Sequence, residues 1–357
     1  MKRIMNFFWK MTTLAGFLTL FSCATAPLVD GYLYPDLYPD LYPDPDQELM
    51  LEDPLQSEPV PPVIRVTLLP GNFDSEIPEV PEPDALAKLL AVMRLYSHKT
   101  MDLEARSDDW YLIIVDQEFR WAEGRMLNGS DPYSEWEQEQ YLPIWDSGSL
   151  GLPIWYRDIS PQVEQQLQEL NQSYGFDPRL RNQHFFDVLY DVPDEDTART
   201  IMVETRFLGL PLSVHPLLVE PLGRVEERIN LLAEDHSRVN GFVNELSQVW
   251  GYFWRPIAGT LRRSMHSYGI AVDILPRYYG RRFPYWRWAL EGGYPRWWTL
   301  SAGAFWFPPS QVVDAFEQEG FVWGGRWLAF DTIHFEYRPE IMVFEKPLLE
   351  IIPHFPE

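Results

Sequence analysis

The four-residue unit Leu-Tyr-Pro-Asp occurs three times in succession, from Leu33 to Asp44. Proline at every fourth position excludes a helix, and the recurring acids oppose collapse into a core. The span 29–83 carries 13 acidic residues and a single basic one, Arg65, so half of the chain's formal net charge of −24 lies there. We therefore expect residues 23–83 to form an extended, disordered tether. A proline-rich docking motif for a partner is the alternative.

The first 22 residues have the pattern of a signal peptide. Basic residues precede an uncharged, mostly apolar run, residues 11–22, that is too short to cross a bilayer as a helix. The segment Leu-Phe-Ser-Cys that ends at Cys23 resembles the lipobox of bacterial lipoproteins. This resemblance implies an exported protein, anchored to a bacterial membrane at its periplasmic or outer-membrane face through a lipid on Cys23. An ordinary secretory signal with an incidental cysteine is the alternative.

Composition excludes several classes of protein. Cys23 is the only cysteine, which excludes a disulfide within the chain and a metal site built from several cysteines. The acidic balance argues against nucleic-acid binding through neutralisation of phosphates. A chain of 357 residues predicts one domain with long appendages, or two domains.

Residues 84–205 have the pattern of a folded α/β region without a cluster of metal-binding side chains. Apolar residues at three- and four-residue steps predict a helix over 83–93. A buried strand is predicted over 111–115, and a second helix over 160–175. The region carries no motif that assigns it a role.

Residues 206–345 have a different pattern, which alternates strands and helices. It predicts a strand over 210–215, a helical stripe over 222–249 divided at Asn240-Gly241, a strand over 269–275, a helix over 308–320, a strand and tight turn over 321–327, and a final strand carrying His334. Helices packed on a small antiparallel sheet make an α+β fold. We expect His215 and His236 to pack or to cap helices.

Two histidines and a carboxylate in this region are of the types that bind a catalytic zinc ion and leave one position open. His266 and Asp273 are seven residues apart, too far for one helical turn, so the chain must leave His266 in a turn, bend at Gly269 and enter the strand that presents Asp273. His334 lies far along the chain. Spacing alone is weak evidence, because scattered polar residues often match it.

Two separated motifs make the pattern more specific. The first is Ser264-x-His266-x-x-Gly269-x-Ala271-x-Asp273, and the second is Trp323-Gly324-Gly325 followed by Asp331-x-x-His334-Phe335-Glu336. Together they resemble peptidase family M15, the group of D-alanyl-D-alanine carboxypeptidases, dipeptidases and L-alanyl-D-glutamate endopeptidases. The resemblance implies a zinc peptidase core of the M15 or hedgehog-like kind over residues 206–345, and one Zn²⁺ bound by His266, Asp273 and His334.

The resemblance also implies catalytic roles. Asp331 would be the general base for a water activated by the metal. In a uniform strand Asp331 and His334 would face opposite sides, so this role requires a turn at 331–333. Glu336, which would share a face with His334, is the alternative base.

Three further residues follow from the same comparison. Arg255 would stabilise the oxyanion that forms when the peptide carbonyl is attacked. Ser264 would hold substrate or cap a turn, and Trp323 would lie at the substrate. Eight arginines stand against two acidic residues over 251–300, which predicts a local positive field that attracts the carboxylates of peptidoglycan stem peptides.

An aromatic-rich insertion over 277–307 is open to two interpretations. Its rings pack the insertion onto the core, which is the usual use of aromatic area, or they form a stacking platform for sugar.

The function that these features predict is hydrolysis of peptidoglycan stem peptides, either as a D-Ala-D-Ala carboxypeptidase or as an L-Ala-D-Glu endopeptidase. A catalytically weak or inactive peptidoglycan-binding lipoprotein on the same fold is the alternative from another class. A peptidase for some other peptide is a third.

Overall fold

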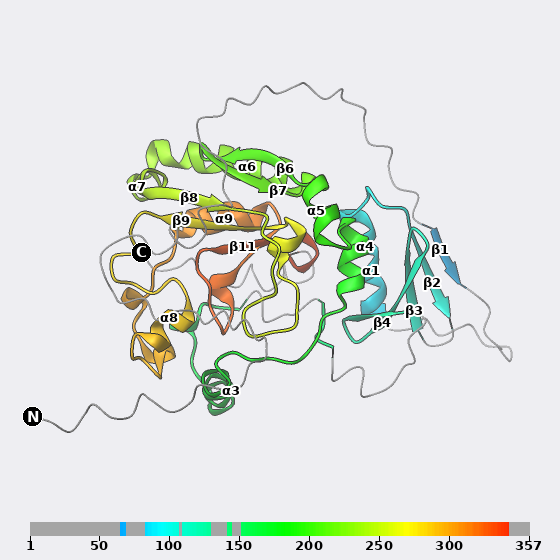
Figure 1. Cartoon of the computed structure of the whole chain (residues 1–357), viewed down its shortest axis with the longest axis horizontal. Coiled ribbons are helices and arrows are strands. Elements are labelled where there is room, and N and C mark those ends of the chain that lie inside the picture. Colours follow the sequence, from blue (N-terminus) through cyan, green and yellow to red (C-terminus); the bar gives the residue numbers. More distant parts are fainter. Residues whose placement is uncertain (1–64, 69–82, 107–108, 130–140, 145–150, 343–357) are drawn as a thin grey trace, which may run out of the picture. The chain divides into compact units, whose positions relative to one another are not determined.

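Figure 1 shows the computed structural model of the chain, which describes residues 65–68, 83–106, 109–129, 141–144 and 151–342. The predictions of a signal peptide over 1–22 and of a lipid on Cys23 lie outside these residues, as does most of the predicted tether. All the described residues belong to one compact unit.

The first sheet has five strands in the order β1-β2-β3-β4-β5, and all neighbours are antiparallel except β1 and β2. Its strands are β1 (Arg65–Leu68), β2 (Met101–Arg106), β3 (Asp109–Ile114), β4 (Gln117–Ala122) and β5 (Arg125–Asn128). Burial alternates along β2 and β3, as expected of a sheet that covers a core with one face. Because β1 lies within the range predicted as tether, that prediction is corrected at residues 65–68, where the chain joins a sheet.

The predicted strand over 111–115 is confirmed except at its last residue. Val115 lies in the tight turn between β3 and β4, with φ of 61° and a side chain that is 64% exposed. A two-residue hairpin turn requires positive φ, and this requirement overrides the strand preference of valine.

Among the described residues of the N-terminal region, the helices are α1 (Pro83–Leu95), α3 (Pro161–Gln172), α4 (Gln183–Tyr190) and α5 (Glu195–Ile201), with a 3-10 turn η3 (Ile154–Tyr156) before α3. The sequence predicted α1 and α3. Ser160, Asn182 and Asp194 precede α3, α4 and α5, and each side-chain oxygen accepts the backbone N–H three residues on. Such caps satisfy amides that have no partner within the helix.

The second sheet has four strands in the order β10-β11-β9-β8, and all its pairs are antiparallel. Its strands are β8 (Leu246–Trp250), β9 (Ala271–Pro276), β10 (Phe321–Trp323) and β11 (His334–Tyr337), and a separate hairpin is formed by β6 (Val203–Phe207) and β7 (Leu210–Val214). This small antiparallel sheet with its helices confirms the α+β class. In β9–β11 the register places His334 directly opposite Asp273.

The helices of this part are α6 (Pro216–Asp235), α7 (Ser237–Glu245), α8 (Trp286–Glu291) and α9 (Ser310–Gln318), and its 3-10 turns are η4 (Met265–Tyr268), η5 (Trp297–Thr299), η6 (Ala302–Ala304) and η7 (Gly324–Arg326). Helix α9 buries Val312, Val313 and Phe316. The ring of Phe316 stacks on that of Phe335 in β11, with centroids 4.0 Å apart. The apolar face of α9 therefore packs on the strand that carries His334.

The helical stripe predicted over 222–249 is only partly correct. Helices α6 and α7 meet at His236 rather than at Asn240-Gly241. The last apolar residues of the stripe form β8, where Val249 pairs with Ile274, so hydrogen bonding to β9 overrides the helical spacing. His236 is the C-cap of α6 and the N-cap of α7, so its predicted capping position is confirmed, although its side chain is exposed and makes no capping hydrogen bond.

One hydrophobic cluster extends through both regions of the chain. It contains Leu89 and Phe119 from the N-terminal region together with Val225, Ile274 and Phe335 from the C-terminal region. The regions over 84–205 and 206–342 therefore share a core.

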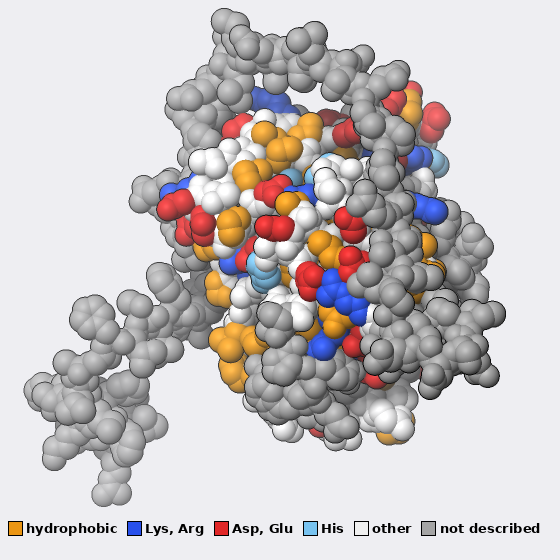
Figure 2. Space-filling model, turned by 90° about the vertical axis from the view of Figure 1, so that its right-hand side faces the viewer, with side chains coloured by type: hydrophobic (Ala, Val, Ile, Leu, Met, Phe, Trp, Pro, Cys, Tyr) orange, Lys and Arg blue, Asp and Glu red, His pale blue; other side chains and the backbone are white. Residues whose placement is uncertain are grey.

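Charges of both signs are intermingled on the molecular face drawn in Figure 2. The first sheet shows the same mixing, because the guanidinium of Arg106 binds both Glu104 and Glu118. Within the described residues, no helix is long and apolar enough to cross a bilayer.

His215 confirms the prediction of a packed, capping histidine. It is buried, its Nδ1 accepts the amide of Leu217 at the start of α6, and its Nε2 lies 3.0 Å from the carbonyl oxygen of Tyr190. Burial lowers the pKa of His215 to about 4. Between that value and the unfolded pKa of about 6.5, only the unfolded chain binds this proton, so the free energy of unfolding falls as the pH decreases through this window.

We expect His215→Asn to weaken this pH dependence. Asparagine keeps an acceptor for the Leu217 amide but does not titrate. Urea unfolding at a series of pH values should show that the wild type loses about 1–3 kcal/mol more than the variant between pH 6.5 and pH 4. Equal losses in the two proteins would contradict this account of His215.

Candidate metal centre

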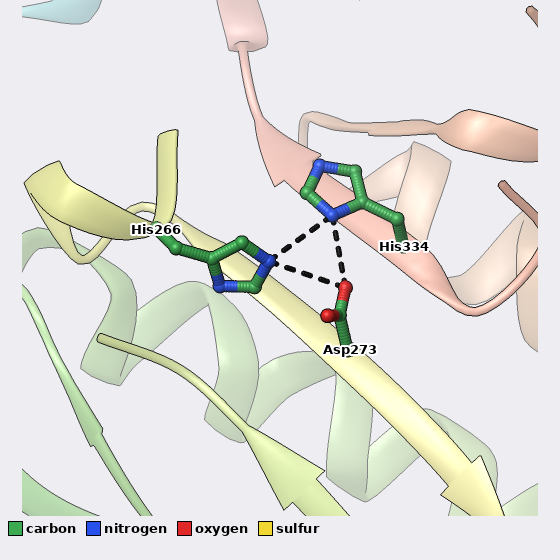
Figure 3. Close-up of side chains that lie close together, drawn as sticks. All are labelled: His266, Asp273 and His334. Carbon is green, nitrogen blue, oxygen red and sulfur yellow. Dashed lines mark hydrogen bonds and ion pairs between the residues drawn. The ribbon is translucent and has the colours of Figure 1, made fainter. Parts of the chain in front are cut away.

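Three buried side chains from different elements point toward one another (Figure 3). His266 comes from η4, Asp273 from β9 and His334 from β11. The Nε2 atom of His266 lies 3.2 Å from Oδ1 of Asp273 and 3.2 Å from Nδ1 of His334, and the latter two atoms are 2.9 Å apart. The structure therefore brings together the three residues that the sequence motifs singled out.

Local backbone structure explains how His266 reaches this point. The Ser264 hydroxyl accepts the backbone N–H of His266 and so caps η4. Gly269 ends η4 with φ of 64°, and a Cβ there would lie 2.7 Å from the His215 backbone nitrogen. Only glycine fits this left-handed position without displacing its neighbours. Of the two roles considered for Ser264, the structure shows the cap.

The outer nitrogen of each imidazole is held by an acceptor. In His266, Nδ1 lies 2.6 Å from the carbonyl oxygen of Gly251, so that nitrogen carries the proton and donates. In His334, Nε2 lies 3.5 Å from Oε2 of Glu336. With protons on these outer nitrogens, both inner nitrogens present lone pairs to the same point as the Asp273 carboxylate.

Electrostatics at this point favour a positive charge. Burial alone would lower the pKa of His334, but Asp273 and Glu336 outweigh burial and raise it to about 10. Burial would likewise raise the pKa of Asp273, yet the two imidazoles hold it well below its usual range. Both shifts have the same cause, which is the close approach of carboxylates to imidazoles in the interior.

The three residues fit a zinc ion in chemistry and in spacing. Two imidazole nitrogens and one carboxylate oxygen form a common donor set for a catalytic zinc, and tetrahedral ligands at the usual bond lengths lie about 3.3 Å from each other. The observed separations of 3.2, 3.2 and 2.9 Å are close to that value. A zinc ion could therefore be accommodated with little movement of the ligands.

Asp331 lies at the turn that the sequence required. Residues 331–333 form a turn before β11, and the amide of Asp331 donates to the carbonyl of Gly324. Within the described part of the chain, the enclosed Oδ1 atom of Asp331 has no hydrogen-bond partner. Burial, and next the negative charge of Asp273, raise the pKa of Asp331 to about 7.

The Trp323-Gly324-Gly325 segment packs against the turn at 331–333 from the interior. Trp323 is buried, and its indole nitrogen donates to the carbonyl of Thr332. A Cβ on Gly324 would lie 2.5 Å from the carbonyl oxygen of Asp331, and one on Gly325 would overlap the Trp323 ring. The structure thus corrects the placement of Trp323, which holds the turn in position from the interior and does not line an open substrate surface.

Arg255 is half-buried and lies in the same region as Asp331. Its backbone is bound to the hydroxyl of Ser267, next to His266. Its positive charge lowers the pKa of both Asp331 and Tyr285, although burial dominates the pKa of each.

The excess of arginine over 251–300 is offset by acids from elsewhere in the chain. Arg262 pairs with Asp177, Arg263 with Asp187 and Arg296 with Glu164. The partners all come from the N-terminal region, so a count over 251–300 overestimates the positive field at the site.

The aromatic insertion mainly packs against the N-terminal region. Trp286, Trp297 and Phe305 are buried in one cluster with Ile154 and Leu167. Two tyrosines of the insertion, Tyr278 and Tyr294, are largely exposed. Packing rather than sugar stacking therefore accounts for most of these rings.

Of the polar groups behind the histidines, the sequence motifs singled out only Glu336, as an alternative base, and not Gly251, Arg338 or Glu340. The Gly251 carbonyl carries no signal in the sequence, because any residue supplies a carbonyl. Glu336, Arg338 and Glu340 do leave one, since charged residues at every second position of a buried apolar segment indicate a buried ionic network.

A comparison with protein families matches residues 258–337 to the family described as D-alanyl-D-alanine carboxypeptidase, within the M15 peptidases. The match spans both motifs and all three residues of the buried cluster. The search of curated proteins and the search of solved structures each found no match.

The chain should bind one zinc ion, and its affinity should fall as the pH decreases. Protons compete for the inner imidazole nitrogens, and the raised pKa of His334 makes this competition strong at neutral pH. Calorimetric titration should show an affinity that rises by up to about tenfold per pH unit between roughly pH 6 and 8. Asp273→Ala should abolish tight binding, whereas His184→Ala, which alters an exposed histidine, should not change it. Equal zinc affinity in the Asp273→Ala variant and the wild type would exclude this site.

Proposed function

We propose, from the premise that this chain is a peptidase of the D-alanyl-D-alanine carboxypeptidase family M15, that it hydrolyses peptidoglycan stem peptides with one zinc ion. The observation that carries the proposal is the convergence of two imidazole nitrogens and a carboxylate oxygen at tetrahedral spacing. The bond cut would be of the D-Ala-D-Ala or the L-Ala-D-Glu type.

His266, Asp273 and His334 would hold the ion. The chemistry supplied by a bound zinc is Lewis-acid polarisation of the peptide carbonyl and easier ionisation of water. The protein's part is to orient both imidazoles so that their inner nitrogens face the ion, through the Gly251 carbonyl and Glu336.

Asp331 would act as the general base. It would take a proton from the attacking water and deliver it to the leaving amine, so that the peptide bond breaks without releasing a free anion. A pKa near neutrality suits this task, because the group must both accept and release a proton.

Glu336 is a weaker candidate for the base. One of its oxygens faces the outer nitrogen of His334, and the other lies 3.5 Å from the guanidinium of Arg338. A carboxylate held on the far side of a ligand is placed to orient that ligand. We assign the proton transfer to Asp331 for this reason.

Arg255 would stabilise the negative charge that develops on the carbonyl oxygen. Two observations support this role. The charge of Arg255 lowers the pKa of Asp331, and the backbone N–H of Arg255 donates to the hydroxyl of Ser267 in η4. We assign Arg255 no further role in binding the substrate.

The export and anchoring of the protein also belong to this proposal. A signal-like segment that ends at Cys23, followed by an acidic, proline-rich stretch, would place the peptidase outside the cytoplasm on a lipid anchor. Peptidoglycan lies in that compartment, so location and proposed substrate agree.

Digestion of purified peptidoglycan tests the proposal. The zinc-loaded chain should release stem-peptide fragments that mass spectrometry identifies, and Asp331→Asn should lower the rate by at least about 100-fold, the usual contribution of a general base. An unchanged product profile with or without added enzyme would refute peptidase action on this substrate. Release by Asp331→Asn at the wild-type rate would remove only the assignment of the base.

A stability measurement shows whether the Asp331→Asn variant is folded. The folded pKa of Asp331 lies above its unfolded value, so the metal-free protein loses stability as the pH rises from about 4 to about 7. Asparagine removes this buried carboxylate, so the metal-free variant should melt at a higher temperature than the wild type at pH 8. A rise of about 2–4 °C would correspond to roughly 1 kcal/mol.

A further inference from the structure

A chain of buried polar contacts leads away from the candidate metal centre. It starts at His334, whose outer nitrogen lies 3.5 Å from Oε2 of Glu336. The other oxygen of Glu336 lies 3.5 Å from Nη1 of Arg338. Glu336 is thus held between a ligand of the proposed metal ion and a cation, and its orientation depends on where that cation is fixed.

Arg338 is fixed from several sides. It is only 1% exposed, and its Nε donates to Oε1 of Glu340 at 2.5 Å. Its Nη2 donates to the carbonyl oxygen of Ile144 at 2.7 Å, and its guanidinium carbon lies 5.3 Å from the centre of the Phe186 ring. Each of the three guanidinium nitrogens therefore has an acceptor, which a buried arginine requires.

Glu340 is itself held by the N-terminal region. The hydroxyl of Tyr96, the residue that follows α1, donates to Oε2 of Glu340 at 2.8 Å, and it lies 3.1 Å from the hydroxyl of Tyr190 in α4. Tyr96, Tyr190 and Glu340 are all buried. The series from His334 to Tyr96, which we call the relay, thus ends at a residue 244 positions away from Glu340.

The contacts that fix Arg338 and Glu340 come largely from the N-terminal region. Ile144, Phe186, Tyr96 and Tyr190 all belong to the region over 84–205, for which the sequence indicated no role. None of the four is a candidate ligand or catalytic group. Ile144 and Phe186 contact Arg338, Tyr96 binds the carboxylate that Arg338 binds, and Tyr190 contacts the hydroxyl of Tyr96.

We propose that Arg338 is a positioning residue for His334, acting through Glu336, and that the N-terminal region completes the metal centre by holding Arg338 in place. This inference rests on the proposed function for the identity of the ion. Carboxylates that accept the outer N–H of a ligand histidine fix its orientation and raise its basicity, and their loss typically costs about 10–100-fold in metal affinity. Here the carboxylate would be fixed by a region outside the matched family segment.

The competing interpretation is that the relay only stabilises the fold. A buried ionic network contributes to stability or to specificity in many proteins without touching function. The two interpretations differ in what they predict for metal affinity, because a purely structural network can be weakened without moving His334.

The chain contains a matched control for this comparison. Arg326 is also buried, and its Nε donates to Oε1 of Glu317 at 2.5 Å, the same contact that Arg338 makes with Glu340. Glu317 lies on α9, outside the relay. Glu340→Gln and Glu317→Gln therefore remove the same charge from the same kind of contact, but only Glu340 is linked to His334 through the relay.

The experiment measures zinc affinity in the full chain by competition with a chromophoric chelator, and the melting temperature of each metal-free variant. We expect Glu340→Gln to weaken zinc binding by about 10-fold or more. Tyr96→Phe, which removes one hydroxyl, should weaken it in the same direction by a smaller factor. Glu317→Gln should change the melting temperature but leave zinc affinity within about threefold of the wild type.

Three results would overturn the inference. The first is zinc affinity within threefold of the wild type in both Glu340→Gln and Tyr96→Phe. The second is an equal loss of affinity in Glu317→Gln, which would show that any lost buried charge disturbs the site. The third is a wild-type chain that binds no zinc, which would also end the proposed function. If the wild type binds zinc and cleaves stem peptides while the relay variants bind zinc normally, only the inference about the relay is contradicted and the proposed function stands. If Glu340→Gln does not fold, Tyr96→Phe decides between the two interpretations.

Discussion

Two imidazole nitrogens and one carboxylate oxygen, from His266, His334 and Asp273, lie in contact with one another in the interior of this protein. Much of the surrounding structure holds these three atoms in place. When both imidazoles are neutral, with their protons donated outward to the Gly251 carbonyl and the Glu336 carboxylate, the inner atoms are acceptors that face one another at 2.9–3.2 Å. Such an arrangement is unfavourable in a medium of low polarity unless a cation occupies the centre. A bound metal ion would turn this repulsion into stabilisation, and protonation of His334 would do so only in part.

Holding repelling groups together requires rigid elements, and the fold supplies them. Asp273 and His334 are opposite each other on paired strands, so their separation is set by the sheet. His266 reaches the same point from a capped 3-10 turn closed by a left-handed glycine. Asp331 stands on a turn braced by a buried tryptophan and two glycines. Site residues held by strands and capped turns keep their geometry better than residues on open loops.

Much of the site could be predicted from sequence because its parts are local. The bend at Gly269, the turn at 331–333 and the three residues of the buried cluster all follow from short motifs whose spacing has a geometric reason. The division of α6 and α7 and the identity of β8 could not be predicted this way. Leu246 and Val249 continue a helical spacing, and only pairing with β9, a segment far along the chain, makes them a strand. Arg262 and Arg263 were counted as free positive charge for the same reason, since Asp177 and Asp187 lie far from them in sequence.

The contacts of the N-terminal region with Arg338 and Glu340 were the part of the structure that the sequence could least predict. The tyrosine that follows α1 and a carbonyl at residue 144 leave no motif, yet they contact the charged residues that follow His334. The hydrophobic core that joins the two regions has the same long-range origin. The family match over residues 258–337 covers the three residues of the buried cluster but neither Arg338 and Glu340 nor the N-terminal residues that contact them.

The most direct test of the account is a crystal structure of the zinc-loaded protein with anomalous diffraction recorded at the zinc absorption edge. The account predicts one strong anomalous peak, about 2.0–2.2 Å from Nε2 of His266, Oδ1 of Asp273 and Nδ1 of His334. Absence of a peak between these atoms, or a peak held by other residues, would contradict it.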